Sequence, residues 1–119
     1  MDKLYEQAML FDFYGELLTE HQRRVYEDAV YNDLSLGEIA EEKGISRQGV
    51  HDLIKRCDRI LQDYESKLHL VERFAKARDT VKEIQKLADG NGEADEDAAA
   101  RRERLSRIGA LSRELLKEL

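Results

Sequence analysis

The stretch SLGEIAEEKGISRQGV, residues 35–50, places two serines and a glycine where short helices begin and end. Ser35 is followed three positions later by Glu38, which is the pattern of a capping box, so a helix begins after Ser35. Gly44 is predicted to end that helix, because the residue after a helix often has a positive φ, which glycine adopts at little cost. Ser46 then caps another helix. Two helices joined by so short a turn can pack in few ways.

The spacing within this stretch is that of a helix-turn-helix. Ala40, Gly44 and Val50 are separated by four and six positions. The small side chain of Ala40 lets two helices cross closely, and Gly44 makes the turn. Ile45, Val50 and Leu53 are predicted to close an apolar wedge that fixes the crossing angle. The second helix of such a unit projects its first turns outward, into the major groove when DNA is bound. The alternative is an ordinary helical hairpin.

Two helices are predicted before this unit. Thr19 and Gln22 form a second capping box, and the helix that follows ends near residues 32–33. Its predicted buried face consists of Val25, Tyr26, Ala29 and Val30. A first helix precedes it, with two apolar stripes: Leu4, Ala8, Phe11 and Leu18, and Tyr5, Met9 and Phe13. So wide an apolar face indicates contact with two partners.

The helix after Ser46 has an apolar stripe in steps of three and four: Val50, Leu53, Ile54, Cys57, Ile60, Leu61, Tyr64 and Leu68. Because the stripe continues to Leu87, one unbroken helix would be very long for this chain. We therefore expect a break near residues 67–70, with His69 as a C-terminal cap. Residues 89–97, DGNGEADED, form the clearest loop. The last helix follows, with an apolar side made of Leu105, Ile108, Leu111, Leu115 and Leu119.

The composition agrees with an all-α protein, since 39% of the 119 residues are charged and none is proline. We predict a helix-turn-helix domain over residues 1–70 and a helical tail over residues 71–119 with a loop at 89–97. No apolar run approaches the roughly 20 residues of a membrane span. The N-terminal residues are unlike a signal peptide. The single cysteine, Cys57, excludes an internal disulfide and suits a reducing cytoplasm.

Residues 17–56, LLTEHQRRVYEDAVYNDLSLGEIAEEKGISRQGVHDLIKR, resemble the fourth region of bacterial sigma factors. Residues 34–56 followed by YESKLHLVERF, residues 64–74, more closely resemble the YlxM family of small bacterial helix-turn-helix proteins. The resemblance covers residues 4–74. It implies a four-helix domain of the sigma-region-4 or winged-helix kind, a helical tail, and a regulatory or accessory role in the signal recognition particle pathway. Gly49 and His51 depart from the family pattern, which has alanine and tyrosine at these positions.

Charge is distributed unevenly along the chain. Residues 1–45 carry a net charge of −7, residues 46–70 carry +1, and residues 71–119 are neutral. A strong DNA binder usually shows a basic face, because neutralised phosphates supply much of the affinity. Only a small basic face is predicted here, and its candidate nucleic-acid-binding residues are Arg47, Gln48, His51, Lys55, Arg56, Arg23 and Arg24. Asp52 lies among them and would repel phosphate. The alternative is a solvated helix face.

Other chemistry finds little support in the sequence. His21, His51 and His69 form no metal-binding pair. Cys57 lies on the apolar stripe and is interpreted as a core thiol. The acidic loop fails the calcium-binding template, because Ala94 and Ala100 stand where that template needs glycine and glutamate. We predict no catalytic site, no metal and no cofactor, and hence a protein that is not an enzyme.

Two functions from different classes remain. The first is a DNA-binding regulator whose binding is weak or partner-assisted. The second is an interaction module that binds the RNA, the GTPase or the receptor of the signal recognition particle, since a helix-turn-helix does not by itself imply DNA. The surplus of apolar stripes in the first helix and the tail also predicts a homodimer, in which one chain covers the apolar surfaces of the other.

Overall fold

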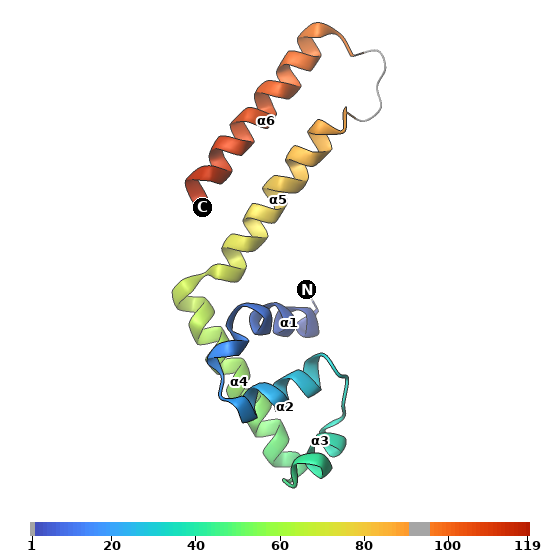
Figure 1. Ribbon diagram of the computed structural model, residues 1–119, viewed down its shortest axis with the longest axis vertical. Helices are drawn as coiled ribbons and strands as arrows, with labels where there is room; N and C mark the ends of the chain where they lie inside the picture. Colours follow the sequence, from blue (N-terminus) through green and yellow to red (C-terminus); the bar gives the residue numbers. More distant parts are fainter. Residues whose placement is uncertain (1, 91–95) are drawn as a thin grey trace. The chain divides into compact units, whose positions relative to one another are not determined.

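The computed structural model describes residues 2–90 and 96–119. The helices are α1 (Lys3–Tyr14), the 3-10 helix η1 (Gly15–Leu17), α2 (Glu20–Val30), α3 (Leu36–Lys43), α4 (Arg47–Leu68), α5 (Leu70–Ala88) and α6 (Ala98–Glu118) (Figure 1). The described residues contain no β-strand, and therefore no wing, which confirms the predicted all-α class. The chain divides into two compact units, Met1–Val71 and Glu72–Leu119.

The first unit is organised around α4, against which α1, α2 and α3 all pack (Figure 1). One apolar cluster joins α1 and α2 to the middle of α4, and its buried members are Leu10, Tyr14, Leu18, Tyr26, Cys57 and Leu61. Burial of these side chains is the main favourable contribution to folding here, at about 1.5–3 kcal/mol for each large apolar side chain. Cys57 is fully buried in this cluster, as the stripe predicted.

The helix-turn-helix has a cluster of its own. Val25, Ile39, Ala40 and Val50 are its buried members, and Leu53 packs against them. Gly44 has φ +70° and lies in the left-handed region, and the N–H of Ile45 donates to the carbonyl oxygen of Ala40 at 3.1 Å. The wedge differs from the prediction at one position. The side chain of Ile45 is 37% exposed and lies outside the cluster, because it sits in the short link between the helices rather than on either buried face.

The predicted helix starts are confirmed. Thr19 with Gln22 and Ser35 with Glu38 both form reciprocal capping boxes. The hydroxyl of Ser46 accepts a hydrogen bond from the N–H of Gly49 at 2.9 Å. Each cap satisfies a backbone donor that the helix itself leaves unpaired.

The first helix is shorter than its apolar stripe predicted. It ends at Tyr14, and Leu18 lies beyond η1 in an extended conformation, although its side chain is still buried. Gly15 lies at this change of direction and packs directly against Phe11. A Cβ at position 15 would stand only 2.8 Å from Cδ1 of Phe11, so a larger residue would force Phe11 to move. The apolar spacing thus identified a buried residue but placed it in the wrong element.

The predicted break between the two long helices is confirmed at His69, which has φ +57° and is left-handed. The N–H of His69 donates to the carbonyl oxygen of Glu65 at 2.8 Å. A non-glycine residue in this conformation is uncommon. Local hydrogen bonds therefore separate α4 from α5, where the apolar stripe alone would continue.

The second unit is a pair of helices, α5 and α6, with little apolar core. Leu111 is its only described side chain that is buried. Ile108 and Leu115 are half-buried, whereas Leu105 and Leu119, predicted on the same side, are exposed. Ion pairs cross the helix pair, for example Arg107 Nη2 to Glu83 Oε1 at 2.9 Å.

The predicted loop at 89–97 lies largely outside the described residues, and so does Ala94 of the rejected calcium template. At its C-terminal end, the side chain of Asp97 caps α6 by accepting from the N–H of Ala100 at 2.7 Å. Glu96 makes a two-point ion pair with Arg104, with both N–O distances at 2.8 Å. Arg104 also donates to the carbonyl oxygen of Leu87, which connects the start of α6 to the end of α5.

Candidate nucleic-acid interface

The first turns of α4 have one buried and one exposed side. Val50 is fully buried and Leu53 is half-buried, so these residues hold the helix against α2 and α3. The five α4 residues predicted from the sequence to contact nucleic acid are all exposed: Arg47, Gln48, His51, Lys55 and Arg56. The fold therefore brings these five side chains to solvent at the start of one helix.

Arg47 lies at the turn between α3 and α4. Its guanidinium packs against Gly37 of α3, since a Cβ on Gly37 would come within 3.0 Å of Nη2 of Arg47. Gly37 thus leaves the room that this side chain occupies. Arg47, Lys55 and Arg56 form no ion pair within residues 2–90 and 96–119, so their charges stay available to an anion.

Asp52 engages two of the other candidates. The side-chain amide of Gln48 donates to Oδ1 of Asp52 at 2.9 Å, and Nδ1 of His51 lies 3.6 Å from the same oxygen. Gln48 would have to leave this carboxylate to read a base edge. The acid that the sequence placed among the cations is therefore in contact with the candidate interface.

The two arginines of α2, which the sequence predicted as further phosphate contacts, make no bond to these α4 side chains in the described residues. Nη2 of Arg24 forms an ion pair with Oε1 of Glu20 at 2.7 Å, within its own helix, and both side chains are exposed. Arg23 is half-buried. Across the described ranges, no hydrogen bond or ion pair links either arginine to α4.

Sequence reasoning missed two cations of this surface. Arg59 is exposed and continues the four-residue spacing of Arg47, His51 and Lys55 along α4. That spacing was a usable signal, because residues four apart lie on the same side of a helix. Lys3 is the other, since α1 brings it to Lys55 across 52 positions of sequence, and no local pattern predicts such a contact.

The Lys3 ammonium, in hydrogen-bonding reach of Lys55, lowers the pKa of the Lys55 side chain. A like charge close by disfavours the charged form of Lys55, and Asp58 opposes this effect only in part. The exposed side of α4 thus contains a pair of mutually repelling cations.

The remaining chemistry of the described residues is limited. Burial raises the pKa of the Cys57 thiol to about 11, so this thiol is protonated and unreactive near neutral pH. In residues 2–90 and 96–119, no three histidine, cysteine, aspartate or glutamate side chains gather as a metal site would need. None of the helices in those residues has the length and apolar character that crossing a membrane requires.

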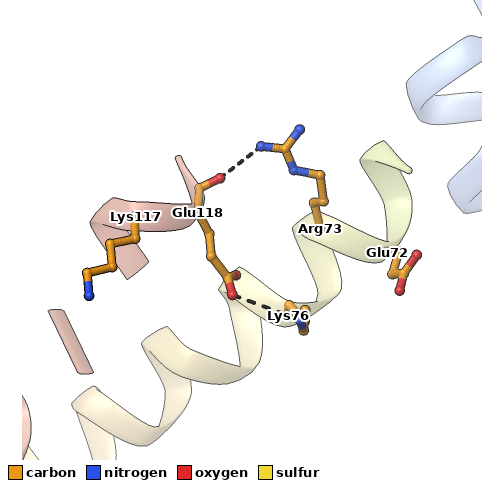
Figure 2. Close-up of a pocket in the computed structure, with 5 residues that line it drawn as sticks. All are labelled: Glu72, Arg73, Lys76, Lys117 and Glu118. Carbon is orange, nitrogen blue, oxygen red and sulfur yellow. Dashed lines mark hydrogen bonds and ion pairs between the residues drawn. The ribbon is translucent and has the colours of Figure 1, made fainter. Parts of the chain in front are cut away.

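A cleft of about 310 Å³ lies in the second unit, lined by Glu72, Arg73, Lys76, Lys117 and Glu118 (Figure 2). Its walls are joined by their own contacts. Nη2 of Arg73 donates to the carbonyl oxygen of Glu118 at 2.9 Å, and Nζ of Lys76 lies 3.9 Å from Oε1 of Glu118 (Figure 2). We interpret this cleft as the place where the end of α6 meets the start of α5.

Comparison with known proteins identifies the family. The model of the UPF0122 family, described as "Putative helix-turn-helix protein, YlxM / p13 like", matches residues 1–101. A UPF0122 protein of Acetivibrio thermocellus is 51% identical over 86 residues, which cover 72% of this chain and 74% of that protein. The UPF0122 protein YlxM of Bacillus subtilis is 40% identical over 99 residues, 83% of this chain and 90% of its own length. A UPF0122 protein of Clostridium botulinum is 41% identical over 109 residues, 91% of this chain and its own full length.

These matches confirm the family resemblance found in the sequence, and the matched range includes the helix-turn-helix and the whole of α5. The chain therefore belongs to the UPF0122 family of YlxM-like helix-turn-helix proteins.

Proposed function

We propose that this protein is a regulatory helix-turn-helix protein that binds DNA through the exposed start of α4. The observation that carries the proposal is the set of unpaired cations there. Arg47, Lys55 and Arg56 are exposed, and the opposite side of the same helix is fixed in the core by Val50. Cations held on a rigid element and directed to solvent are what phosphate binding needs.

The binding is weak or assisted by a partner. Residues 1–45 carry a net charge of −7, which opposes the approach of a polyanion. Asp52 adds a negative charge inside the interface itself. A small cationic surface within an acidic chain supports a modest, strongly salt-dependent affinity.

The family resemblance supports a place for this regulator in the signal recognition particle pathway of the cytoplasm. A second function is favoured by the acidic first half of the chain together with Asp52. In it the protein is an interaction module for the RNA, the GTPase or the receptor of that particle. The exposed apolar side chains of α1, α5 and α6 support a homodimer as the working form in either case.

The proposal is tested by fluorescence anisotropy with a labelled duplex of random sequence, titrated at several salt concentrations from 20 mM upward. Arg47→Ala combined with Lys55→Ala is expected to weaken binding and to reduce the slope of log K against log salt by about two. Lys82→Ala combined with Lys86→Ala in α5 removes the same charge from exposed positions outside the interface and serves as the matched control.

If Arg47→Ala combined with Lys55→Ala left both the affinity and the salt slope unchanged, α4 would not be the helix that binds DNA. The same titrations with the particle's RNA and with its GTPase separate the second function from the first. Binding to either of these, with none to duplex DNA, would replace the DNA-binding regulator by the interaction module.

A further inference from the structure

The helices α1 and α4 pack against each other, and two hydrogen bonds join them in a fixed register. Nε2 of Gln7 donates to Oδ1 of Asp58 at 3.0 Å, and the Tyr14 hydroxyl donates to Oε1 of Glu65 at 2.5 Å. Both pairs are 51 residues apart in sequence. One helical turn before Gln7 and Asp58, the same seam brings together Lys3 and Lys55, consistent with their mutual contact.

Two acids near this lysine pair, Asp58 and Asp2, accept hydrogen bonds from other groups. Oδ1 of Asp58 accepts from both the Gln7 amide and the Tyr26 hydroxyl, the latter at 2.6 Å. Asp2 accepts from the N–H of Leu4 as the N-cap of α1. In the described part of the chain, neither Lys3 nor Lys55 forms an ion pair with a carboxylate. Both side chains are exposed.

The two ammonium groups repel each other, and the nearby carboxylate of Asp58 offsets this only in part. One further anion between them would relieve the repulsion. The N-terminus of α1 lies beside Lys3 and adds the partial positive charge of its helix dipole, which the carboxylate of the N-cap Asp2 opposes. The pair also lies in the row formed by Arg47, His51, Lys55 and Arg59, four residues apart. Lys55 is eight residues from Arg47, about 12 Å along the helix axis, so the two positions meet different phosphates of one strand.

We propose that Lys3 and Lys55 together hold one phosphate of a DNA backbone while the start of α4 meets the adjacent groove. This inference rests on the proposed function, and it adds α1 to the interface. Because the two lysines share a phosphate, they act as one contact. The bound phosphate neutralises the pair that repels itself in the free protein.

The test uses the same anisotropy titrations on Lys3→Gln, on Lys55→Gln and on the combined variant that carries both changes. Arg47→Ala is measured beside them as a separate variant, and Lys82→Gln is the matched control. Each lysine variant is expected to weaken binding several-fold at low salt. The combined variant is expected to lower the salt slope by about one, the value for a single phosphate, rather than two. Its loss of affinity should be smaller than the product of the two single losses.

Thermal melts separate a binding defect from a folding defect. Removing one of two repelling charges leaves the fold intact, so both single variants should melt at or above the wild-type temperature. A Lys3→Gln variant that binds like the wild type, beside an Arg47→Ala variant that does not, would overturn the shared phosphate and leave the proposed function standing. A slope change of two in the combined variant would also overturn it. If the wild type binds no duplex, or binds only RNA with the same lysine dependence, both proposals are wrong.

Discussion

The hydroxyl of Tyr14 donates a hydrogen bond to Oε1 of Glu65 at 2.5 Å, and it accepts one from the N–H of Leu70 at 3.0 Å. The same carboxylate oxygen of Glu65 accepts from the N–H of Val71 at 3.0 Å. Two N–H groups at the start of α5, which have no partner inside their own helix, are satisfied in this way. The end of α1 therefore fixes the point at which α4 gives way to α5.

Replacing Tyr14 with phenylalanine removes the hydroxyl and keeps the ring. We expect the free energy of unfolding to fall by about 1 kcal/mol, because a hydrogen bond to a charged group is lost and Leu70 loses its acceptor. Tyr64→Phe is the control. Tyr64 stacks on Tyr14, but its hydroxyl makes no hydrogen bond within residues 2–90 and 96–119. Urea unfolding measures both variants, and an equal loss in the two would mean that the hydrogen bonds of the Tyr14 hydroxyl are not its cause.

Stability should decline in alkaline solution. Burial raises the pKa of the Cys57 thiol to about 11 and that of Tyr31 to about 12, and it also raises the pKa values of Tyr14 and Tyr26. Because these groups keep their protons longer in the folded state, the unfolded state binds fewer protons above pH 9, and the free energy of unfolding falls as pH rises. Urea midpoints between pH 8 and 10.5 measure the slope. A flat profile would contradict this assignment, and Tyr26→Phe should make the decline shallower.

The turn of the helix-turn-helix offers a test of backbone conformation alone. Gly44 has φ +70°, and apart from Gly44 and its two chain neighbours no residue comes within 4 Å of the position where a Cβ would stand. Gly44→Ala should therefore cost about 1 kcal/mol of stability through backbone strain rather than through a clash. Gly44→Asn is the comparison, because asparagine tolerates the left-handed region better than alanine. If alanine and asparagine were equally stable at this position, the strain argument would fail.

The charge pair on the candidate interface gives a spectroscopic prediction. Lys3 lowers the pKa of the Lys55 side chain, so Lys3→Gln should raise that pKa toward its ordinary value. Asp58 acts in the opposite direction and is present in both proteins. An NMR titration of the side-chain carbon next to Nζ of Lys55 reports the change directly. An unaltered midpoint would mean that the two ammonium groups are not in contact in solution.

The local features of this fold were predictable from sequence, because each depends on residues a few positions apart. The capping boxes at Thr19 and Ser35, the left-handed Gly44 and the break at His69 are all of this kind. The end of α1 was not predictable, since the apolar spacing continues through η1 to Leu18. Periodicity reports which side chains are buried, and burial does not require one continuous helix.

The candidate interface was likewise predictable from the sequence only in part. The exposed side of α4 follows from helical spacing, which also extends to Arg59. The contact of Lys3 with Lys55 depends on the seam between α1 and α4, which polar pairs 51 residues apart hold in register. The periodicity of a sequence does not show which polar side chain of another helix a given polar side chain will contact. The burial of Tyr26 was predicted from the sequence, but its hydrogen bond to Asp58 was not.

Self-association is the last prediction, and it follows from apolar side chains left exposed in the second unit and on α1. Leu105 is 59% exposed and Leu116 is 72% exposed, and Leu4, Tyr5, Phe13, Phe74 and Val81 are exposed as well. Helices of about 20 residues with one buried side chain between them gain little stability from each other, so a second copy that covers these surfaces would stabilise both. Sedimentation equilibrium at micromolar concentration should show a dimer. Leu105→Glu combined with Leu116→Glu should give a monomer, because it places charges in the interface, whereas Leu36→Glu on α3 should leave the dimer intact. A wild-type chain that remains monomeric well above micromolar concentration would rule the dimer out, and the apolar side chains of α1 and α6 would then need another partner.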